Sequence, residues 1–136
     1  SFKQELLVGT HNFTATTGNT FKIALFTSDA SLGASTTAYS TSNEITNSSG
    51  TAYTAGGATL TSVTPTTSGT TALCDFADVS YTSASFTANG ALIYNSSASD
   101  KAVCAIAFGS DKTVTSGTFT IQFPTADATN AIIRLA

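Results

Sequence analysis

The amino-acid sequence predicts an all-β protein: an antiparallel, jelly-roll-like β-sandwich of about eight strands with a short N-terminal arm or helix. Turn signals made of Gly, Pro, Asn, Asp and Ser recur at short intervals from Gly57 onward and separate short apolar stretches. Ser and Thr fill about a third of the 136 residues, and Thr favours extended backbone. No stretch reads as a helix long enough for a βαβ crossover, so the pattern is typical of a sandwich, with a partly closed barrel as the alternative.

The predicted strands are short and most are bounded by turn residues. They are Phe21 to Thr27, Ala58 to Val63, Thr71 to Phe76, Ser83 to Thr87, Ala91 to Asn95, Lys101 to Phe108, Thr118 to Phe123 and Ala131 to Leu135. The turns between the later strands are expected at Asn89-Gly90, Ser99-Asp100, Gly109-Ser110-Asp111 and Ser116-Gly117.

Two of these strands carry different hydrophobic patterns. Thr118 to Phe123 alternates strictly, which predicts one face in the core and one in solvent. Lys101 to Phe108 is instead a continuous apolar run from Val103 onward, which is typical of a strand covered on both faces. We therefore expect this strand to be central in its sheet or to lie at a subunit contact.

The chain is predicted to form a single domain, residues 1–136. Residues 1–20 form an N-terminal arm and loop, in which Ser1 to Val8 makes a short helix or arm that must dock on the domain or on a neighbour. Residues 28–57 form a long connection, and connections of this length within a compact domain are usually functional.

Composition argues against several classes of partner. Five basic and eight acidic residues give a net charge of −3, with no cluster of either sign. Nucleic acids and anionic membranes are bound through concentrated Lys and Arg, so we expect neither as a partner. No run reaches the ~18 apolar residues of a membrane span. The N-terminus lacks a signal-peptide pattern, which favours folding in the cytoplasm.

The residues that could carry catalysis are scattered. His11 is the single histidine and is expected at the surface of the arm. No Ser lies in a Gly-x-Ser-x-Gly elbow. Asp75 and Asp78 flank a strand end and could form a carboxylate pair or a calcium ligand set, but the Asp residues are better interpreted as turn formers. We expect no enzyme, no cofactor and no metal site.

Two cysteines and four tyrosines leave alternatives open. Cys74 and Cys104 each lie on an apolar strand face; free buried thiols are favoured over a disulfide. Carbohydrate binding usually needs exposed aromatic rings, and the chain has no Trp. Tyr39 and Tyr53, in the long connection, remain candidates for surface contacts.

Several sequence segments together carry a family resemblance. They are Leu25-Phe26-Thr27, Ala34 to Tyr39, Gly50 to Gly57, Phe86 to Asn95, Lys101-Ala102-Val103 and Phe108 to Lys112. The series resembles a family of small structural proteins of tailed bacteriophages, of the podovirus-like and cyanophage-like kind. The resemblance runs over nearly the whole chain from about Phe21. It departs at Tyr81, near which relatives often carry Trp.

This resemblance implies a capsid cement, or decoration, protein with a jelly-roll-like fold, made in the host cytoplasm, that stabilises the major capsid shell from outside by non-covalent contacts. The implied partners are the major capsid protein and a second or third copy of the chain, as a homodimer or homotrimer. Three contact segments are expected: Phe2 to Val8, Ser31 to Gly57, and the outward face of Lys101 to Phe108 with Phe26. The candidate interface residues are Phe2, Leu6, Leu7, Phe26, Tyr39, Tyr53 and Val103. A tail, neck or fibre component and a host-surface carbohydrate-binding module are the alternatives.

Overall fold

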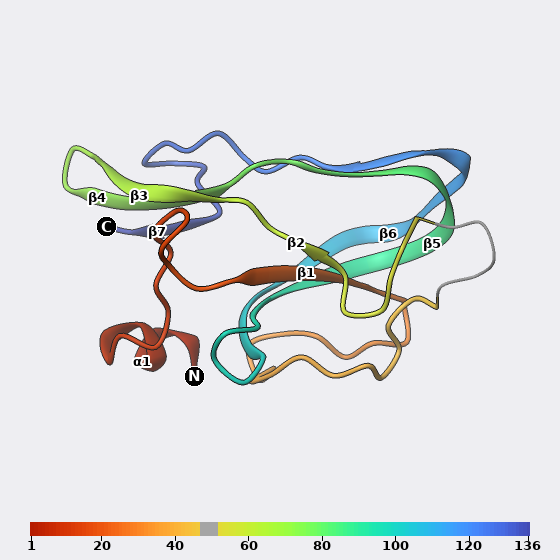
Figure 1. Ribbon diagram of the computed structural model, residues 1–136, viewed down its shortest axis with the longest axis horizontal. Helices are drawn as coiled ribbons and strands as arrows, with labels where there is room; N and C mark the ends of the chain where they lie inside the picture. Colours follow the sequence, from red (N-terminus) through yellow and green to blue (C-terminus); the bar gives the residue numbers. More distant parts are fainter. Residues whose placement is uncertain (47–51) are drawn as a thin grey trace.

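Two antiparallel sheets and one short helix make up the fold in the computed structural model, which describes residues 1–46 and 52–136 (Figure 1). The described elements are α1 (Phe2–Leu7), β1 (Phe21–Phe26), β2 (Ala58–Thr59), β3 (Ser62–Ser68), β4 (Thr71–Phe76), β5 (Val79–Asn95), β6 (Lys101–Ile121) and β7 (Ile133–Leu135). One sheet has the order β2-β1-β5-β6 and the other has the order β3-β4-β7. The prediction of a mostly β, sandwich-like protein with a short N-terminal helix is therefore confirmed.

The hairpin formed by β5 and β6 is the largest element of the fold. It pairs from Val79 opposite Ile121 to Asn95 opposite Lys101. Figure 1 shows it curving strongly, so that its open end runs back over the half that pairs with β1. Four of the predicted strands fall in this hairpin as two long strands, and a fifth, Ala58 to Val63, is divided between β2 and β3, so the described residues contain seven strands in place of the eight predicted.

Three predicted turns inside the hairpin are wrong, because the chain bends there without leaving the ladder. Asn89-Gly90 lies within β5, and both Gly109-Ser110-Asp111 and Ser116-Gly117 lie within β6. The pairing register shifts near these positions. Gly109 has a φ of +78°, and a Cβ at Gly90 would lie 2.8 Å from the Ile106 carbonyl oxygen, so glycine serves bending and close strand approach here.

The expected turn at Ser99-Asp100 is confirmed as the tip of the hairpin. Both residues have positive φ, 53° and 56°, at the end of the five-residue connection that reverses the chain between Asn95 and Lys101. The predicted strand Ala58 to Val63 is divided between β2 and β3. Between them Leu60 is buried, and its N–H donates to the Phe21 carbonyl.

The core is enclosed by the two halves of the β5-β6 hairpin together with the β3-β4-β7 sheet. Phe13 stacks on Phe21 with ring centroids 4.4 Å apart, and Phe76 contacts both rings. Burying each such ring stabilises the fold by about 1.5–3 kcal/mol relative to exposure. Along Thr118 to Phe123 the buried and exposed residues alternate as predicted.

β6 is an edge strand, so the prediction that Lys101 to Phe108 is central is wrong. Ala105 and Ala107 are exposed on the outward face, whereas Val103 is buried in the core. The apolar run therefore has one covered face and a free edge. Its other predicted setting, a subunit contact, remains a prediction.

Candidate interaction surface along the edge of β6

The free edge of β6 begins at Val103. Before it, residues 37–39 of the long connection cover the strand: the Ala102 N–H donates to the Thr37 carbonyl (2.9 Å) and the Tyr39 N–H donates to the Asp100 carbonyl (2.8 Å). After Ala102, β6 pairs only with β5 in the part of the chain that the structure describes. An apolar edge of this kind presents unpaired backbone donors and acceptors to any strand that approaches.

A groove follows the outward side of this edge. One hollow of about 420 Å³ lies between the start of α1, the 33–36 segment and β6, and its lining includes Phe2, Gly33 and Val103. A second hollow, of about 240 Å³, continues from Gly33 and Ala105 to Ala107 and also touches Phe26. The three contact segments predicted from the sequence thus meet along this groove.

An apolar opening lies on the other side of the same edge. Its volume is about 490 Å³, and the half-buried rings of Phe108 and Phe119 line it together with Ile106 and Ile132. This opening and the hollow of about 240 Å³ on the opposite face share Ile106 in their lining. The middle of the free edge therefore has apolar surface within reach on both sides.

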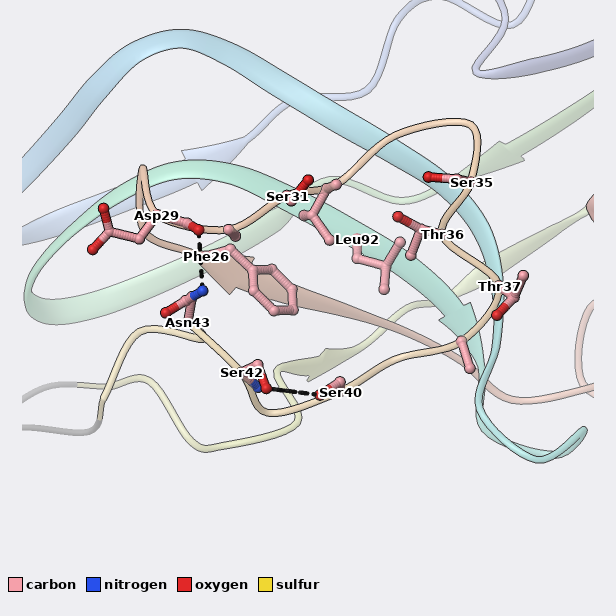
Figure 2. A pocket seen from close by; sticks show the side chains of 13 residues that line it. Phe26, Asp29, Ser31, Ser35, Thr36, Thr37, Ser40, Ser42, Asn43 and Leu92 are labelled. Atoms are coloured by element: carbon pink, nitrogen blue, oxygen red, sulfur yellow. Dashed lines mark hydrogen bonds between the residues drawn. The ribbon is translucent and has the colours of Figure 1, made fainter.

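The long connection covers the outer face of β1 and β5. Phe26 and Leu92 lie beneath it and are almost completely buried, 2% and 1% exposed. Figure 2 shows these two side chains at the floor of a hollow of about 440 Å³ whose walls carry hydroxyl groups. The hydroxyl-bearing residues are Ser31, Ser35, Thr36, Thr37, Ser40 and Ser42. The hollow thus has a polar rim, and the two apolar side chains at its floor are almost inaccessible to solvent.

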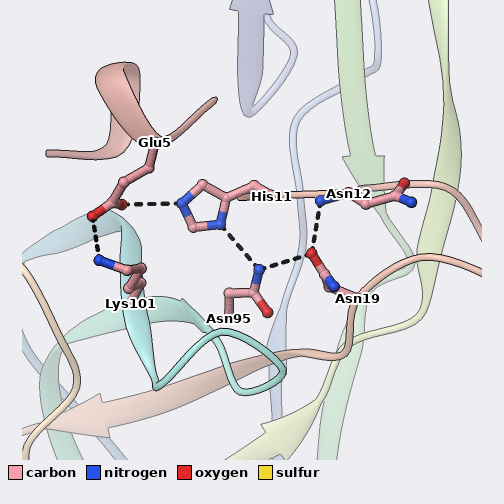
Figure 3. Close-up of polar contacts among 6 residues, drawn as sticks. All are labelled: Glu5, His11, Asn12, Asn19, Asn95 and Lys101. Atoms are coloured by element: carbon pink, nitrogen blue, oxygen red, sulfur yellow. Dashed lines mark hydrogen bonds and ion pairs between the residues drawn. The ribbon is translucent and has the colours of Figure 1, made fainter. Parts of the chain in front are cut away.

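A buried polar network fixes α1 beside the start of β6 (Figure 3). Glu5 accepts from Lys101 (2.8 Å) and contacts the His11 ring nitrogen Nε2 at 3.1 Å. The other His11 nitrogen lies 3.0 Å from the Asn95 amide, which also donates to Asn19. The expectation of a surface role for His11 is wrong, because the residue is only 6% exposed and fills a position between the arm and the hairpin.

The charge of Glu5 is stabilised by these partners. The hydrogen bond from Lys101 lowers the pKa of the Glu5 carboxyl, with a smaller contribution from His11, and this outweighs the opposing effect of burial. The network therefore holds α1 against the hairpin in the ionised state of Glu5.

A second carboxylate anchors the long connection. Glu44 accepts from the hydroxyls of Tyr39 (2.6 Å) and Tyr53 and from the Gly56 N–H (2.7 Å). The Tyr39 ring stacks on Tyr94 with centroids 4.5 Å apart. Burial and the bond to Glu44 raise the pKa of both Tyr39 and Tyr53.

The predicted interface residues divide into two groups. Phe2, Phe26 and Val103 line the groove, and Leu7 is 88% exposed on α1, with Leu6 half-buried beside it. The tyrosines of the connection serve the fold. Tyr53 is fully buried, so its expected surface contact is wrong, and Tyr39 is half-buried against Tyr94. Residues 47–51 of the connection lie outside the described residues.

Two cysteines and one aspartate considered in the sequence analysis lie where they contribute to the fold. Cys74 and Cys104 are free, as favoured, and burial raises the pKa of their thiols to about 12 and about 11. Asp127 accepts from the backbone N–H groups of Thr129 and Asn130, as predicted for a turn former. Across residues 1–46 and 52–136, no three His, Cys, Asp or Glu side chains are grouped to hold a metal ion. Among the same residues, no helix is long and apolar enough to cross a membrane.

Sequence reasoning missed the residues that hold this surface in place. Glu44 and Asn95 carried no motif, although a lone Glu in a Ser/Thr-rich connection and an Asn at a strand end are both unusual enough to mark.

Comparison of the sequence and the structure with protein-family models, curated proteins and solved structures found no match.

Proposed function

We propose that this protein is a non-catalytic structural component of a phage particle, a capsid cement or decoration protein that binds outside the major capsid shell. The observation that carries the proposal is the free apolar edge of β6, where α1, the 33–36 segment and the strand itself line one groove. Surfaces of this kind suit contact with other proteins better than chemistry on a small molecule.

The sequence resemblance and the character of the surface support the same role. The chain carries few charges, 10% of its residues, and its polar surface is rich in hydroxyl groups. Such a domain packs at high density without strong repulsion between copies. The proposal keeps the jelly-roll-like arrangement and the location on the outer capsid, after synthesis in the host cytoplasm. The proposed partners are the major capsid protein and further copies of the chain.

The copy number of this chain in purified particles tests the proposal. Quantitative mass spectrometry would compare it with the major capsid protein, and a ratio near one is expected for a protein that covers the capsid. A few copies per particle would reject cementing in favour of a tail, neck or fibre component. Absence from particles would reject every virion role.

A functional readout makes the test independent of abundance. Particles that lack this protein are expected to release their DNA at a lower temperature than complete particles, because a cement protein stabilises the shell by binding it. Re-addition of the purified protein should restore the original temperature. Particles without the protein that withstand warming equally well would exclude a cementing role.

Carbohydrate binding is the second candidate, and the hydroxyl-lined hollow of Figure 2 is the observation in its favour. Its aromatic side chain, Phe26, is only 2% exposed, so a sugar ring would find no aromatic platform there. We therefore place it below the structural role. Binding of purified host glycans by the isolated protein, lost on Asp29→Ala, would reverse that order.

A further inference from the structure

We propose that residues 1–11 form a pH-sensitive latch, which is docked on the hairpin near neutral pH and released when His11 takes up a proton. The latch consists of α1 and the segment that leads from it to His11. The polar network of Figure 3 makes docking depend on a neutral His11 ring, and the strands of both sheets pair without any residue of the latch. The inference goes beyond the proposed function, because it concerns how this chain responds to acid.

Two backbone N–H groups fix the direction of the hydrogen bonds beside His11. The Ser97 N–H donates to Asn95 Oδ1 (3.1 Å), so the amide nitrogen of Asn95 faces the His11 ring. The Asn12 N–H donates to Asn19 Oδ1 (2.7 Å), and the same oxygen accepts one hydrogen of the Asn95 amide. His11 Nδ1 therefore has to accept the other hydrogen of that amide, and the ring hydrogen lies on Nε2.

The docked ring has no place for a second proton. Nε2 carries its hydrogen toward Glu5 Oε2, 3.1 Å away, so an added proton must go to Nδ1. There it would point at the Asn95 amide nitrogen, which is itself a donor 3.0 Å away. Turning the Asn95 amide round would give up its bonds to Ser97 and Asn19. Because the His11 side chain has no exposed surface, solvent cannot replace the lost bond.

The charges around this ring do not offset that conflict. Glu5 on α1 is the carboxylate that faces it, and the Lys101 ammonium of β6 already pairs with Glu5 at 2.8 Å. The other groups in contact are uncharged: the Asn95 amide of β5 and the rings of Phe2, Phe13 and Phe21. An imidazolium would therefore leave two donors facing each other, with one carboxylate shared between two cations.

The latch is held by polar groups more than by apolar burial. Glu5 and His11 are each only 6% exposed, whereas the apolar Phe2 and Leu6 are half-buried and Leu7 is 88% exposed. Buried polar groups stabilise a contact only while they are paired. Disturbing the network at His11 therefore removes the interactions on which docking mainly depends.

The latch has a fixed end at Asn12. The Asn19 N–H donates to the Asn12 carbonyl (2.8 Å), and the Asn12 N–H donates back to the Asn19 side chain. The next residue, Phe13, is buried and stacks on Phe21 of β1. Release is therefore expected to stop at residue 11 and to leave the sheets folded.

Acid favours the released latch. A histidine in water takes up a proton below about pH 6.5, so the released latch binds one proton more than the docked latch. Each unit of pH below that value shifts the docking equilibrium toward release by up to about tenfold. Glu5 acts in the same direction at lower pH. Its pKa lies below 4.5 in the docked state, so its contribution is complete above pH 4.5 and is lost as the pH falls through the lower value.

Nuclear magnetic resonance tests the latch directly, because His11 is the single histidine of the chain. Near neutral pH the nitrogen-15 shifts of the ring should show the neutral Nε2–H tautomer. Nuclear Overhauser effects should join the rings of Phe2 and Phe13, whose centroids lie 6.4 Å apart. On acidification, protonation of His11 and loss of the Phe2–Phe13 contact should follow one titration curve, while the Ile93 amide of β5 stays protected from exchange.

Two variants separate the proton on His11 from other effects of acid. The side chain of His11→Gln can donate to Glu5 and accept from Asn95 but takes up no proton, so its latch should stay docked down to about pH 4.5. Lys3→Gln is the matched control, since it changes an exposed charge on the same helix, and it should titrate like the wild type.

Several results would overturn the inference. An Nδ1–H tautomer near neutral pH contradicts the hydrogen-bond directions, and a His11 ring that titrates while Phe2 still contacts Phe13 contradicts the coupling. Loss of protection at Ile93 together with the latch would mean global unfolding in place of release. A docked His11→Gln variant that opens over the same pH range as the wild type would show that another group responds to acid. If His11→Gln does not dock at all, the wild-type measurements decide alone.

Discussion

β5 and β6 carry nearly the same kind of apolar run and occupy opposite situations in the sheet. From Ala91 to Asn95 every residue of β5 is buried, because the core covers one face, the long connection covers the other, and β1 and β6 pair along the two edges. From Ala102 to Phe108 the residues of β6 are as apolar, yet two of them are exposed and one edge is free. An apolar run in the sequence thus indicates that a strand has apolar surface to bury, while its position in the sheet decides which elements can cover that surface.

The largest expected difference between β5 and β6 is tested with the same substitution in each strand. Ile93→Ala in β5 should lower the free energy of unfolding by about 2–5 kcal/mol, because Ile93 is fully buried and its removal leaves a cavity. Ile106→Ala in β6 should cost about 1 kcal/mol, since Ile106 is half-buried. Urea denaturation measures both. Equal losses would contradict the difference in burial.

A second variant loosens β6 and leaves β5 in place. Glu5→Ala should lower the free energy of unfolding by about 1–3 kcal/mol, because Lys101 and the buried His11 both lose a partner. Hydrogen exchange should rise at the start of β6 and stay slow at Ile93. Glu5→Gln is the control, since its amide oxygen can still accept from Lys101 or from His11, although not from both, and it should cost less than Glu5→Ala. Faster exchange throughout β5 in Glu5→Ala would argue against local anchoring.

Two tyrosines of β5 allow a smaller test within one strand. The Tyr94 hydroxyl donates to the Gly56 carbonyl (2.7 Å), so Tyr94→Phe should cost about 1 kcal/mol. The buried Tyr81 hydroxyl points towards Ala58 but makes no hydrogen bond of good geometry with the described residues. Tyr81→Phe should therefore be neutral or slightly stabilising. Thermal unfolding of both variants decides, and a clear loss in Tyr81→Phe would show that its hydroxyl has a partner.

The smallest expected effect is a pH dependence at the anchor of β6. The folded-state pKa of Glu5 lies below its ordinary value of 4.5, so its contribution to stability is complete above pH 4.5. The contribution is lost as the pH falls through the lower folded-state value. Wild-type protein should lose stability in this range more steeply than Glu5→Gln. Parallel declines would show that the Lys101 contact does not stabilise the fold.

The strands were predictable from the sequence where their patterns are local. Strict alternation identified Thr118 to Phe123, and positive-φ residues at Ser99 and Asp100 formed the predicted hairpin turn. The bends at Gly90 and Gly109 were mistaken for chain reversals, because glycine marks both and only the partner strand distinguishes them.

The interaction surface was partly predictable. Phe2 and Val103 were placed at contacts because they belong to apolar segments, and both line the groove. The position of β6 at the sheet edge depends on which strands pair across long sequence distances, and no local pattern encodes that. The burial of His11 depends in the same way on Glu5 and Asn95, which are brought to it by the docking of the arm on the hairpin.

The curved hairpin has a mechanical consequence. In a sandwich held only by side chains, a pulling force can slide or peel one layer from the other. Here the backbones of β5 and β6 continue from the half that pairs with β1 into the half that runs back over it, and the ladder between them persists through the bends (Figure 1). A load that separates those two halves must therefore straighten two hydrogen-bonded backbones through the same bends, in addition to parting the side chains between the halves.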